Sequence, residues 1–476
     1  MYSDLALLIG GEWRAKGDAG CSEPVINPAD GRILANLPHA GARDLSDSVV
    51  AATDGMRVWQ KISAYERANI MHRAADLFRT RLDSIARIIV QEQGKVLNEA
   101  MIEAAMAADV IDWYAEEGRR AYGRIVPGRV AGVRQMVVHE PVGIVAAFTP
   151  WNFPVVTPAR KIAGALGAGC SIIIKASEET PGACVEMARC FMEAGLPAGV
   201  LNLVFGVPAE VSEKLLARPE IRKISFTGSV GVGKHLAKMA TRTMKRSTME
   251  LGGHSPVVVF DDVNPEQVAD MIAAYKFRNA GQVCISPTRF YVQEGVYARF
   301  LERFSAYAKG LRLGNGLEAS TTMGPLANPR RLDAMDMFVK DALEQGGKIR
   351  AGGKRYGNEG FYYEPTIVTD VPDHSLIMTE EPFGPIAPIV TFKTFDEVVE
   401  RANSLEFGLA AYAFTTSIAR ATAIGDALQT GMVGINSVAI STPETPFGGI
   451  KHSGHGSEGG IEGLEAYLNV KFISQA

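Results

Sequence analysis

The architecture of this chain follows from four short apolar runs, Val142-Gly-Ile-Val-Ala-Ala-Phe148, Ser171-Ile-Ile-Ile174, Val200-Leu-Asn-Leu-Val-Phe205 and Lys223-Ile-Ser-Phe226. Helical patterns alternate with these runs, near residues 159–167, 180–194, 209–217 and 232–241. Apolar strands that alternate with helices predict a parallel sheet covered by helices on both faces, which is the doubly wound α/β architecture. Ligands of such sheets bind at the carboxyl ends of the strands.

The flanking regions contain further elements of the same kind. Apolar residues at three-and-four spacing predict N-terminal helices over 42–59, 65–90 and 98–120. A second α/β series follows up to about residue 440, with strands expected at 255–260, 289–292 and 386–392. The change in rhythm predicts a boundary near residue 250. A glycine-rich loop is expected over 446–460, followed by a terminal strand over 464–473.

The composition is that of an ordinary globular chain. Of its 476 residues, 47% are hydrophobic and 21% are charged, and 49 Lys and Arg against 53 Asp and Glu leave a net charge of -4. This balance disfavours disorder, and the overall basic excess that grips nucleic acid is lacking. The N-terminus shows no cationic leader, and no apolar run approaches the roughly 18–20 residues that span a bilayer. We therefore expect a cytoplasmic protein without nucleic-acid or membrane partners.

One of the five cysteines stands apart from the others. The five are scattered and form no C-x-x-C pair, which disfavours a disulfide framework and a structural zinc site. Cys284 lies in a polar, glycine-containing segment between Arg278 and Arg289. Cationic neighbours favour the thiolate, the form that attacks electrophiles, so Cys284 is a candidate nucleophile. The cysteines at 21, 170, 184 and 190 are expected to sit in helical or apolar surroundings as inert side chains.

Three further segments place polar groups beside glycine or proline. Glu250-Leu-Gly-Gly253 offers a carboxylate base, or else a surface glutamate in a turn. Pro150-Trp-Asn-Phe-Pro154 offers an aromatic wall and, at Asn152, an amide donor for an oxyanion, or else a purely structural turn. Gly228-Ser-Val-Gly-Val-Gly-Lys234 predicts either a nucleotide-binding turn or a plain tight turn. It resembles a P-loop except that His235 stands where Ser or Thr would hold magnesium.

Taken in order, these segments and four others resemble the motifs of the aldehyde dehydrogenase superfamily: Thr149-Pro-Trp-Asn-Phe-Pro154, Lys175-Ala-Ser-Glu178, Phe226-Thr-Gly-Ser229, Glu250-Leu-Gly-Gly253, Gly281-Gln-Val-Cys284, Glu381-Pro-Phe-Gly-Pro385 and Pro446-Phe-Gly-Gly-Ile-Lys451. The resemblance covers essentially the whole chain. It implies two doubly wound α/β domains and a small β oligomerisation arm. The implied ranges are 1–120 and 141–250 for the NAD-binding domain, 251–445 for the catalytic domain, and 121–140 with 463–476 for the arm.

The resemblance also implies roles for individual residues. Cys284 would form a thiohemiacetal with the aldehyde and, after hydride transfer to the nicotinamide, a thioester. Asn152 and the backbone N–H of Cys284 would hold the oxyanion, and Glu250 would activate the hydrolytic water. The implied cofactor-binding residues are Trp151, Lys175, Glu178, Gly228, Ser229, Glu381 and Phe383.

Cofactor and substrate choice follow from charged residues. Glu178 favours NAD, with NADP as an alternative, because a carboxylate suits ribose hydroxyls and repels an additional phosphate. Within the superfamily the chain most resembles succinate-semialdehyde and α-ketoglutaric semialdehyde dehydrogenases. That resemblance implies that Arg160, Arg278 and Ser441 receive the distal carboxylate of the substrate. The alternative for both arginines is an interdomain ion pair.

The expected function is therefore the NAD-dependent oxidation of a carboxylated semialdehyde to the dicarboxylate. The alternatives are an aldehyde dehydrogenase of another substrate range, a coenzyme A-acylating relative, against which the base Glu250 argues, and a P-loop nucleotide hydrolase. The resemblance implies a homodimer or a homotetramer. No metal is expected, because His452 and His455 have no third ligand nearby.

Overall fold

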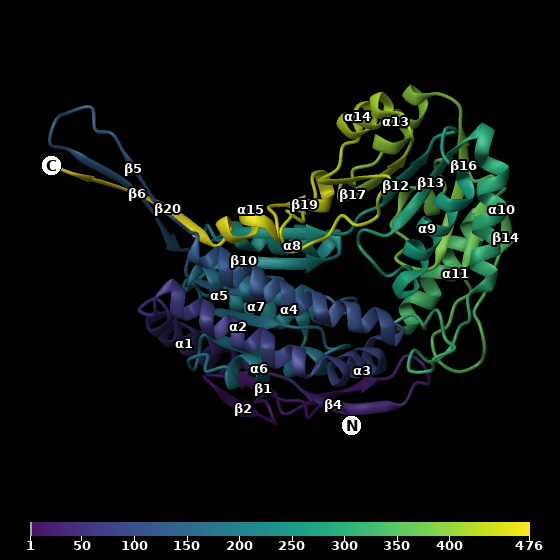
Figure 1. Ribbon diagram of the computed structural model, residues 1–476. Helices are drawn as coiled ribbons and strands as arrows, with labels where there is room; N and C mark the ends of the chain where they lie inside the picture. The colour runs from purple at the N-terminus through teal and green to yellow at the C-terminus, as the bar shows by residue number, and fades with distance from the viewer. Residues whose placement is uncertain (1) are drawn as a thin grey trace.

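A computed structural model describes residues 2–476 and shows two α/β units and a projecting arm (Figure 1). The sheet of the first unit has eight strands in the order β19 (Gly454–His455), β11 (Arg246–Leu251), β10 (Ile221–Gly228), β7 (Ile144–Phe148), β8 (Ile172–Lys175), β9 (Leu201–Val204), β1 (Leu7–Ile9) and β2 (Glu12–Arg14). The strands from β11 to β9 are parallel, and the edge strands β19, β1 and β2 run antiparallel to their neighbours.

The sheet of the second unit has seven strands in the order β14 (Lys348–Ala351), β15 (Thr366–Thr369), β16 (Ile386–Phe392), β13 (Pro287–Gln293), β12 (Ser255–Val259), β17 (Ala410–Phe414) and β18 (Met432–Ile435). All its pairings are parallel except that of β14. Every residue of β7, β8, β9, β12 and β17 is buried, as expected for strands covered on both faces. The predicted doubly wound α/β class is confirmed.

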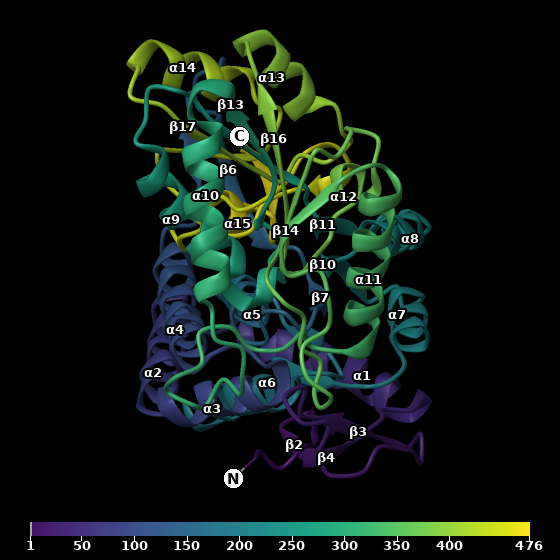
Figure 2. The same ribbon diagram turned by 90° about the vertical axis from the view of Figure 1, so that its right-hand side faces the viewer.

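Helices cover both sheets, as the two views in Figures 1 and 2 show. The first unit contains α1 (Ala42–Trp59), α2 (Ala64–Thr80), α3 (Leu82–Gln93), α4 (Leu97–Arg119), α5 (Val156–Ala168), α6 (Gly182–Glu193), α7 (Pro208–Leu216) and α8 (Val230–Thr241). The second contains α9 (Pro265–Phe277), α10 (Glu294–Gly310), α11 (Pro329–Glu344), α12 (Leu376–Thr379), α13 (Phe395–Asn403) and α14 (Ile418–Ala427). The single helix predicted over 65–90 is wrong, because Arg81 leaves the helical conformation and separates α2 from α3.

The arm is a three-stranded antiparallel sheet of β5 (Arg124–Val126), β6 (Arg134–Pro141) and β20 (Leu468–Gln475). It extends away from both units and carries the C-terminus (Figure 1). The predicted terminal strand starts later than expected, at Leu468, because residues 460–465 form the helix α15 (Gly460–Glu465). Leu464 and Tyr467 are buried in the first core, and the Tyr467 ring fills the space where Gly164 has no Cβ.

The two units meet next to the candidate site. β11 ends at Leu251 in the first sheet, and β12 begins at Ser255 in the second. The glycine-rich segment 446–460 is not all loop, since its β19 pairs with β11.

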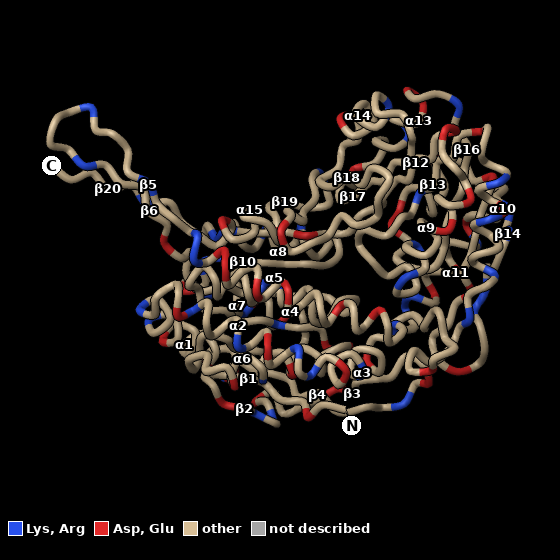
Figure 3. Tube along the Cα trace, viewed as in Figure 1, with Lys and Arg blue, Asp and Glu red and all other residues tan. Residues whose placement is uncertain are grey.

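Lys and Arg are interspersed with Asp and Glu along both units (Figure 3). Within residues 2–476 no helix is long and apolar enough to cross a membrane. The division into cofactor-binding, catalytic and oligomerisation parts stays a prediction.

Candidate active site

A cavity of about 1050 Å³ lies at the carboxyl ends of β7, β10 and β11, and both units contribute to its wall. This is where ligands of doubly wound sheets bind. All but two of the predicted site residues line it: Trp151, Asn152, Arg160, Gly228, Ser229, Glu250, Arg278, Cys284, Glu381, Phe383 and Ser441. The two exceptions, Lys175 and Glu178, lie at and just beyond the end of the neighbouring strand β8.

The loop that carries Cys284 is held in an unusual backbone conformation. Asn279, Ala280 and Gly281 have positive φ angles of 51°, 50° and 75° in succession. Strain of this kind persists only where the surroundings enforce it, and it is common at functional sites. A Cβ on Gly281 would lie 2.1 Å from the carbonyl oxygen of Gly384, so only glycine allows this close approach. The Cys284 loop is therefore packed directly against the segment that follows Glu381.

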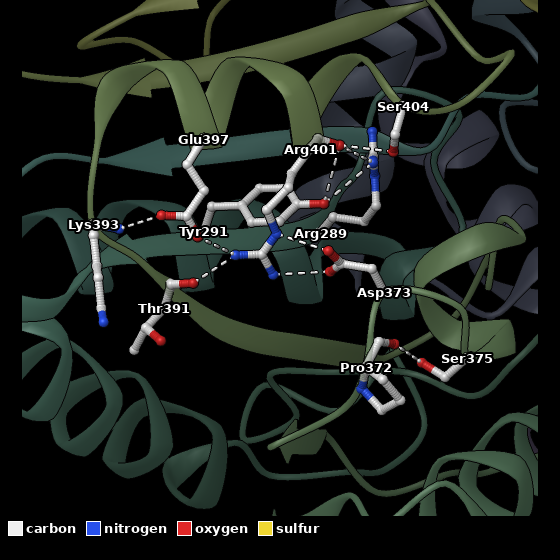
Figure 4. A network of polar contacts seen from close by, with 10 residues as sticks. All are labelled: Arg289, Tyr291, Pro372, Asp373, Ser375, Thr391, Lys393, Glu397, Arg401 and Ser404. Atoms are coloured by element: carbon white, nitrogen blue, oxygen red, sulfur yellow. Dashed lines mark hydrogen bonds and ion pairs between the residues drawn. The ribbon is translucent and has the colours of Figure 1, made fainter.

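The charges around Cys284 differ from the sequence-based expectation. Burial and the carboxylates of Glu250 and Glu381 raise the pKa of the Cys284 thiol well above its usual value. Arg289 does not compensate, because its buried guanidinium donates to the backbone carbonyls of His254 and Ala402. It also donates to the backbone carbonyl of Arg401, within the polar network shown in Figure 4. The prediction that flanking cations favour the thiolate is wrong for Arg289, whose role is structural. The thiol needs a nearby base instead.

The remaining cysteines fall into two groups. Burial raises the pKa values of Cys170 and Cys190 to about 11 and that of Cys184 further. Cys21 is exposed, and its Sγ lies 3.7 Å from Nδ1 of His39. The expected apolar surroundings are therefore absent at Cys21, which sits just before a surface strand. Cys284 is the cysteine that lines the cavity.

Glu250 is a buried carboxyl that lines the cavity together with Cys284. It is the penultimate residue of β11, it is 3% exposed, and burial raises its pKa to about 7. The charge of Glu458 raises this pKa further, whereas that of Lys161 lowers it. Lys161 forms a buried ion pair with Glu458 and donates to Oγ1 of Thr227 at 2.8 Å. A carboxyl with a pKa near neutrality, beside a thiol, suits general-base catalysis. The alternative of a surface glutamate is wrong.

Asn152 keeps one amide hydrogen for a ligand. Its Nδ2 donates to the carbonyl of Gln282 at 3.1 Å, and a side-chain amide has two donors. The carbonyl oxygen of Asn152 accepts from Nζ of Lys95 at 2.9 Å and from Nδ2 of Asn279 at 3.1 Å. Asn152 is thus fixed on both its backbone and its side chain while it lines the cavity. A donor that is held in place before the substrate arrives suits an oxyanion.

The residues around the start of α8 fit a bound pyrophosphate. Ser229 is the N-cap of α8 but its side chain caps no N–H, so the first amides of the helix are left for an anion. The P-loop hypothesis is wrong, because the segment is a strand end followed directly by a helix. Lys234 lies inside α8, where its exposed Nζ is 3.1 Å from Nε2 of His452. Gly233 permits close packing, since a Cβ there would meet the Leu251 side chain at 2.3 Å.

A second group of predicted cofactor residues lines the cavity near Glu250. The Glu381 carboxylate accepts from the backbone N–H of Gly253 at 3.1 Å, and burial raises its pKa to about 8. A Cβ on Gly252 would lie 2.3 Å from this carboxylate. The rings of Trp151 and Phe383 meet edge to face, with centroids 5.5 Å apart. These aromatic and carboxylate groups fit a planar ring and a ribose.

Lys175 and Glu178 form an ion pair with each other. The charges of Glu23 and Glu179 also act on Lys175, although Glu179 is itself paired with Arg330, so carboxylates outnumber the cations here. Such an environment is negative, and it suits hydroxyl groups better than phosphate.

Arg160 and Arg278 have no acidic partner within 4 Å anywhere in residues 2–476, so the interdomain ion pair is wrong. Arg160 donates to Oγ of Ser441 at 2.9 Å, and it lies 4.4 Å from the Phe447 ring centroid. Arg278 lies 4.4 Å from the ring centroid of Tyr275. Nη1 of Arg160 and Nε of Arg278 are buried without a hydrogen-bond partner. Arg160 is buried and Arg278 is half-buried, and both line one cavity without an acidic partner, an arrangement that suits an anionic ligand.

Several charged residues around this cavity were not predicted from the sequence: Lys95, Glu99, Glu103 and Glu458, which line it, and Lys161, which pairs with Glu458. A signal existed for three of them, since Lys95, Glu99 and Glu103 recur every four residues among alanines on what is a buried helix face. Glu458 lies in a glycine-rich segment that gave no such signal.

In the described part of the chain, no three His, Cys, Asp or Glu side chains are grouped to hold a metal ion.

Comparison with known proteins places this geometry in context. The model of the aldehyde dehydrogenase family matches residues 13–473. A putative 4-(hydroxymethyl)benzenesulfonate dehydrogenase of Comamonas testosteroni is 45% identical, over 99% of this chain and 98% of that protein. An NADP⁺-dependent succinate-semialdehyde dehydrogenase of Escherichia coli is 41% identical, over 98% and 96%. The crystal structure of succinate-semialdehyde dehydrogenase from Burkholderia pseudomallei superposes with a TM-score of 0.97 at 41% identity, covering 100% of this chain and 98% of that one.

Proposed function

The chain belongs to the aldehyde dehydrogenase family, and from this premise we propose that it oxidises an aldehyde bearing a distal carboxylate to the dicarboxylate. Family membership makes it an oxidoreductase that uses NAD or NADP. Succinate semialdehyde and α-ketoglutaric semialdehyde are the proposed substrates. We further propose that it works in the cytoplasm as a homodimer or homotetramer joined through the arm.

The observation that carries the substrate class is the pair of unpaired arginines. Arg160 and Arg278 lie beside the cavity that Cys284 lines, and each has a buried nitrogen without a partner. The substrate carboxylate would accept from both guanidinium groups, and from Ser441 once its hydroxyl turns towards the cavity. A neutral aldehyde would offer neither guanidinium group an anionic partner.

The residues of the site account for each step of the reaction. Glu250 takes the thiol proton as Sγ of Cys284 attacks the aldehyde carbon, because burial beside carboxylates disfavours a free thiolate. The oxyanion accepts from the free amide hydrogen of Asn152 and from the backbone N–H of Cys284. When bound, the nicotinamide supplies the acceptor for the hydride that leaves this carbon. Glu250, after losing its proton, then deprotonates the water that cleaves the thioester.

NAD is the proposed cofactor in preference to NADP. The support is the Glu178 carboxylate, which pairs with Lys175, together with the charges of Glu23 and Glu179, which also act on Lys175. An additional phosphate on the ribose would meet these carboxylates. The E. coli relative is named as NADP⁺-dependent, which makes a direct comparison of the two cofactors the necessary test.

A sulfonated aromatic aldehyde is a second candidate substrate. The relative named for 4-(hydroxymethyl)benzenesulfonate is 45% identical, and a sulfonate carries the same single charge as a carboxylate. The cavity wall beside the arginines includes the apolar side chains Phe153, Val156 and Ile440, which suit an aromatic body. Both candidates share the requirement for an anion opposite the reacting carbonyl.

The test is to replace Arg278 by Ala and compare anionic with neutral aldehydes of similar length. A charge-assisted hydrogen bond is worth about 1.5–3 kcal/mol, so kcat/KM for the anionic aldehyde should fall by about 10- to 150-fold. Activity on the neutral aldehyde should change much less. Arg299→Ala, which removes an exposed arginine far from the cavity, is the matched control. Equal losses on both substrates would contradict the proposal.

A further inference from the structure

The helix α4 directs one charged face at the candidate active site. Lys95, just before the helix, and Glu99 and Glu103 within it recur at intervals of four residues, and all three line the cavity. Lys95 and Glu103 form an ion pair of 2.5 Å, with each side chain 1% exposed. A buried pair of this kind costs desolvation and is weak support for stability by itself. Its contacts indicate a different role.

The Lys95–Glu103 pair holds the segment that contains Asn152. Nζ of Lys95 donates to the carbonyl oxygen of Asn152 at 2.9 Å. Oε1 of Glu103 accepts from the backbone N–H of Val155 at 3.0 Å, at the start of α5. Lys95 and Glu103 thus hold the Asn152 turn at both ends, and Nζ of Lys95 lies 4.2 Å from the ring centroid of Phe153 between these two contacts.

The third residue holds the opposite side of the site. Oε2 of Glu99 accepts from the backbone N–H of Asn279 at 3.0 Å, at the first of the three positive-φ residues before Cys284. Asn279 in turn donates from Nδ2 to the carbonyl oxygens of Asn152 and Gln282. The charged side chains at and just before the start of α4 therefore hold both the backbone of Asn152 and the loop that carries Cys284.

We propose that Lys95, with Glu103 and Glu99, is a positioning residue that sets the Asn152 amide and the Cys284 N–H at the spacing at which they share one oxyanion. The inference rests on the proposed function, in which these two donors stabilise the thiohemiacetal oxyanion. Donors help only when they are held in place before the charge develops, so loosening Asn152 should lower kcat and leave KM for the aldehyde nearly unchanged.

The experiment is a double-mutant cycle of Lys95→Met and Asn152→Ala, measured as kcat and KM with NAD and the anionic aldehyde. We expect Lys95→Met to lower kcat by about 10- to 100-fold with KM changed less than about threefold. In the Asn152→Ala background the same change should lower kcat less than about twofold, because Lys95 acts through Asn152.

A second variant keeps the test valid if Lys95→Met folds poorly with Glu103 left unpaired. Lys95→Met with Glu103→Gln removes both charges, keeps the volume and retains an oxygen for the Val155 N–H. It should melt close to the parent protein and still lose kcat. Parental kcat in this folded double variant would overturn the inference. A cycle in which the kcat losses of Lys95→Met and Asn152→Ala simply multiply would overturn it too. Wild-type kcat in Asn152→Ala would overturn the oxyanion assignment of the proposed function as well.

Discussion

The pKa of Glu250 makes a quantitative prediction about acyl-enzyme hydrolysis. Burial raises this pKa to about 7, and the base must be ionised to deprotonate water. A group with this pKa is about one-tenth ionised at pH 6 and about nine-tenths ionised at pH 8, so the hydrolysis rate should rise about tenfold between them. The rise is expected because the pKa of Glu250 is raised. A glutamate with its ordinary pKa is already ionised at pH 6, so its hydrolysis rate would not change between pH 6 and pH 8.

The assay isolates this step from the cofactor. p-Nitrophenyl acetate acylates the thiol directly, and the decay of the acetyl-enzyme is then followed at each pH. Glu250→Gln should lower the decay rate by about 100- to 10,000-fold and remove the pH dependence. Glu266→Gln, at an exposed glutamate of α9, is the control and should behave like the parent protein.

A substitution of the neighbouring Glu458 tests independently what raises the pKa of Glu250. Its charge raises the pKa of Glu250, so Glu458→Gln should move the midpoint of the profile to lower pH. In the acetyl-enzyme the sulfur of Cys284 is a thioester and does not titrate, so the measured midpoint reports Glu250 together with the charged groups that act on it, Glu458 and Lys161. A profile that is flat from pH 6 to 8 in the parent protein, or a Glu250→Gln variant with parental decay, would refute this account of the base.

Three shorter predictions concern the cofactor, the backbone and the arm. Glu178→Gln should raise kcat/KM for NADP relative to NAD by about tenfold or more, because like charges that face each other cost several kcal/mol; an unchanged ratio in steady-state kinetics contradicts it. Gly281→Ala should lower the melting temperature by several degrees, since its Cβ would lie 2.1 Å from a carbonyl oxygen, whereas Gly425→Ala in α14, with open space around it, should not. Val470→Glu with Phe472→Glu, at side chains 67% and 59% exposed on β20, should give monomers by light scattering if the arm joins subunits; an unchanged mass counts against that role.

The sequence predicted what depends on local pattern and missed what depends on distant partners. The apolar runs placed β7, β8, β9 and β10 because buried parallel strands are apolar throughout. The glycine motif at 228–234 was ambiguous, because a strand end followed by a helix and a P-loop share the same spacing. Only the structure shows Lys234 on the outside of α8.

Side-chain direction explains the other differences. Arg289 is five residues from Cys284 in the chain, yet it lies in β13 and donates to backbone carbonyls of the second core. Sequence proximity therefore gave the wrong charge environment for the thiol. Lys95, Glu99 and Glu103 recur every four residues in the sequence, but an exposed charged stripe has the same spacing. Their contacts to the site depend on turns that lie more than fifty residues away.

The link between β11 and β12 has a consequence for how the enzyme is put together. The proposed base and amide donor belong to one α/β unit, and the sulfur belongs to the other. Only three residues, 252–254, separate β11, which carries the base, from β12, the first strand of the sheet in the sulfur's unit. Neither half by itself contains a complete set of reacting groups. Substitutions anywhere along the seam between the halves are thus able to change turnover by altering how the halves dock, even when they touch no ligand.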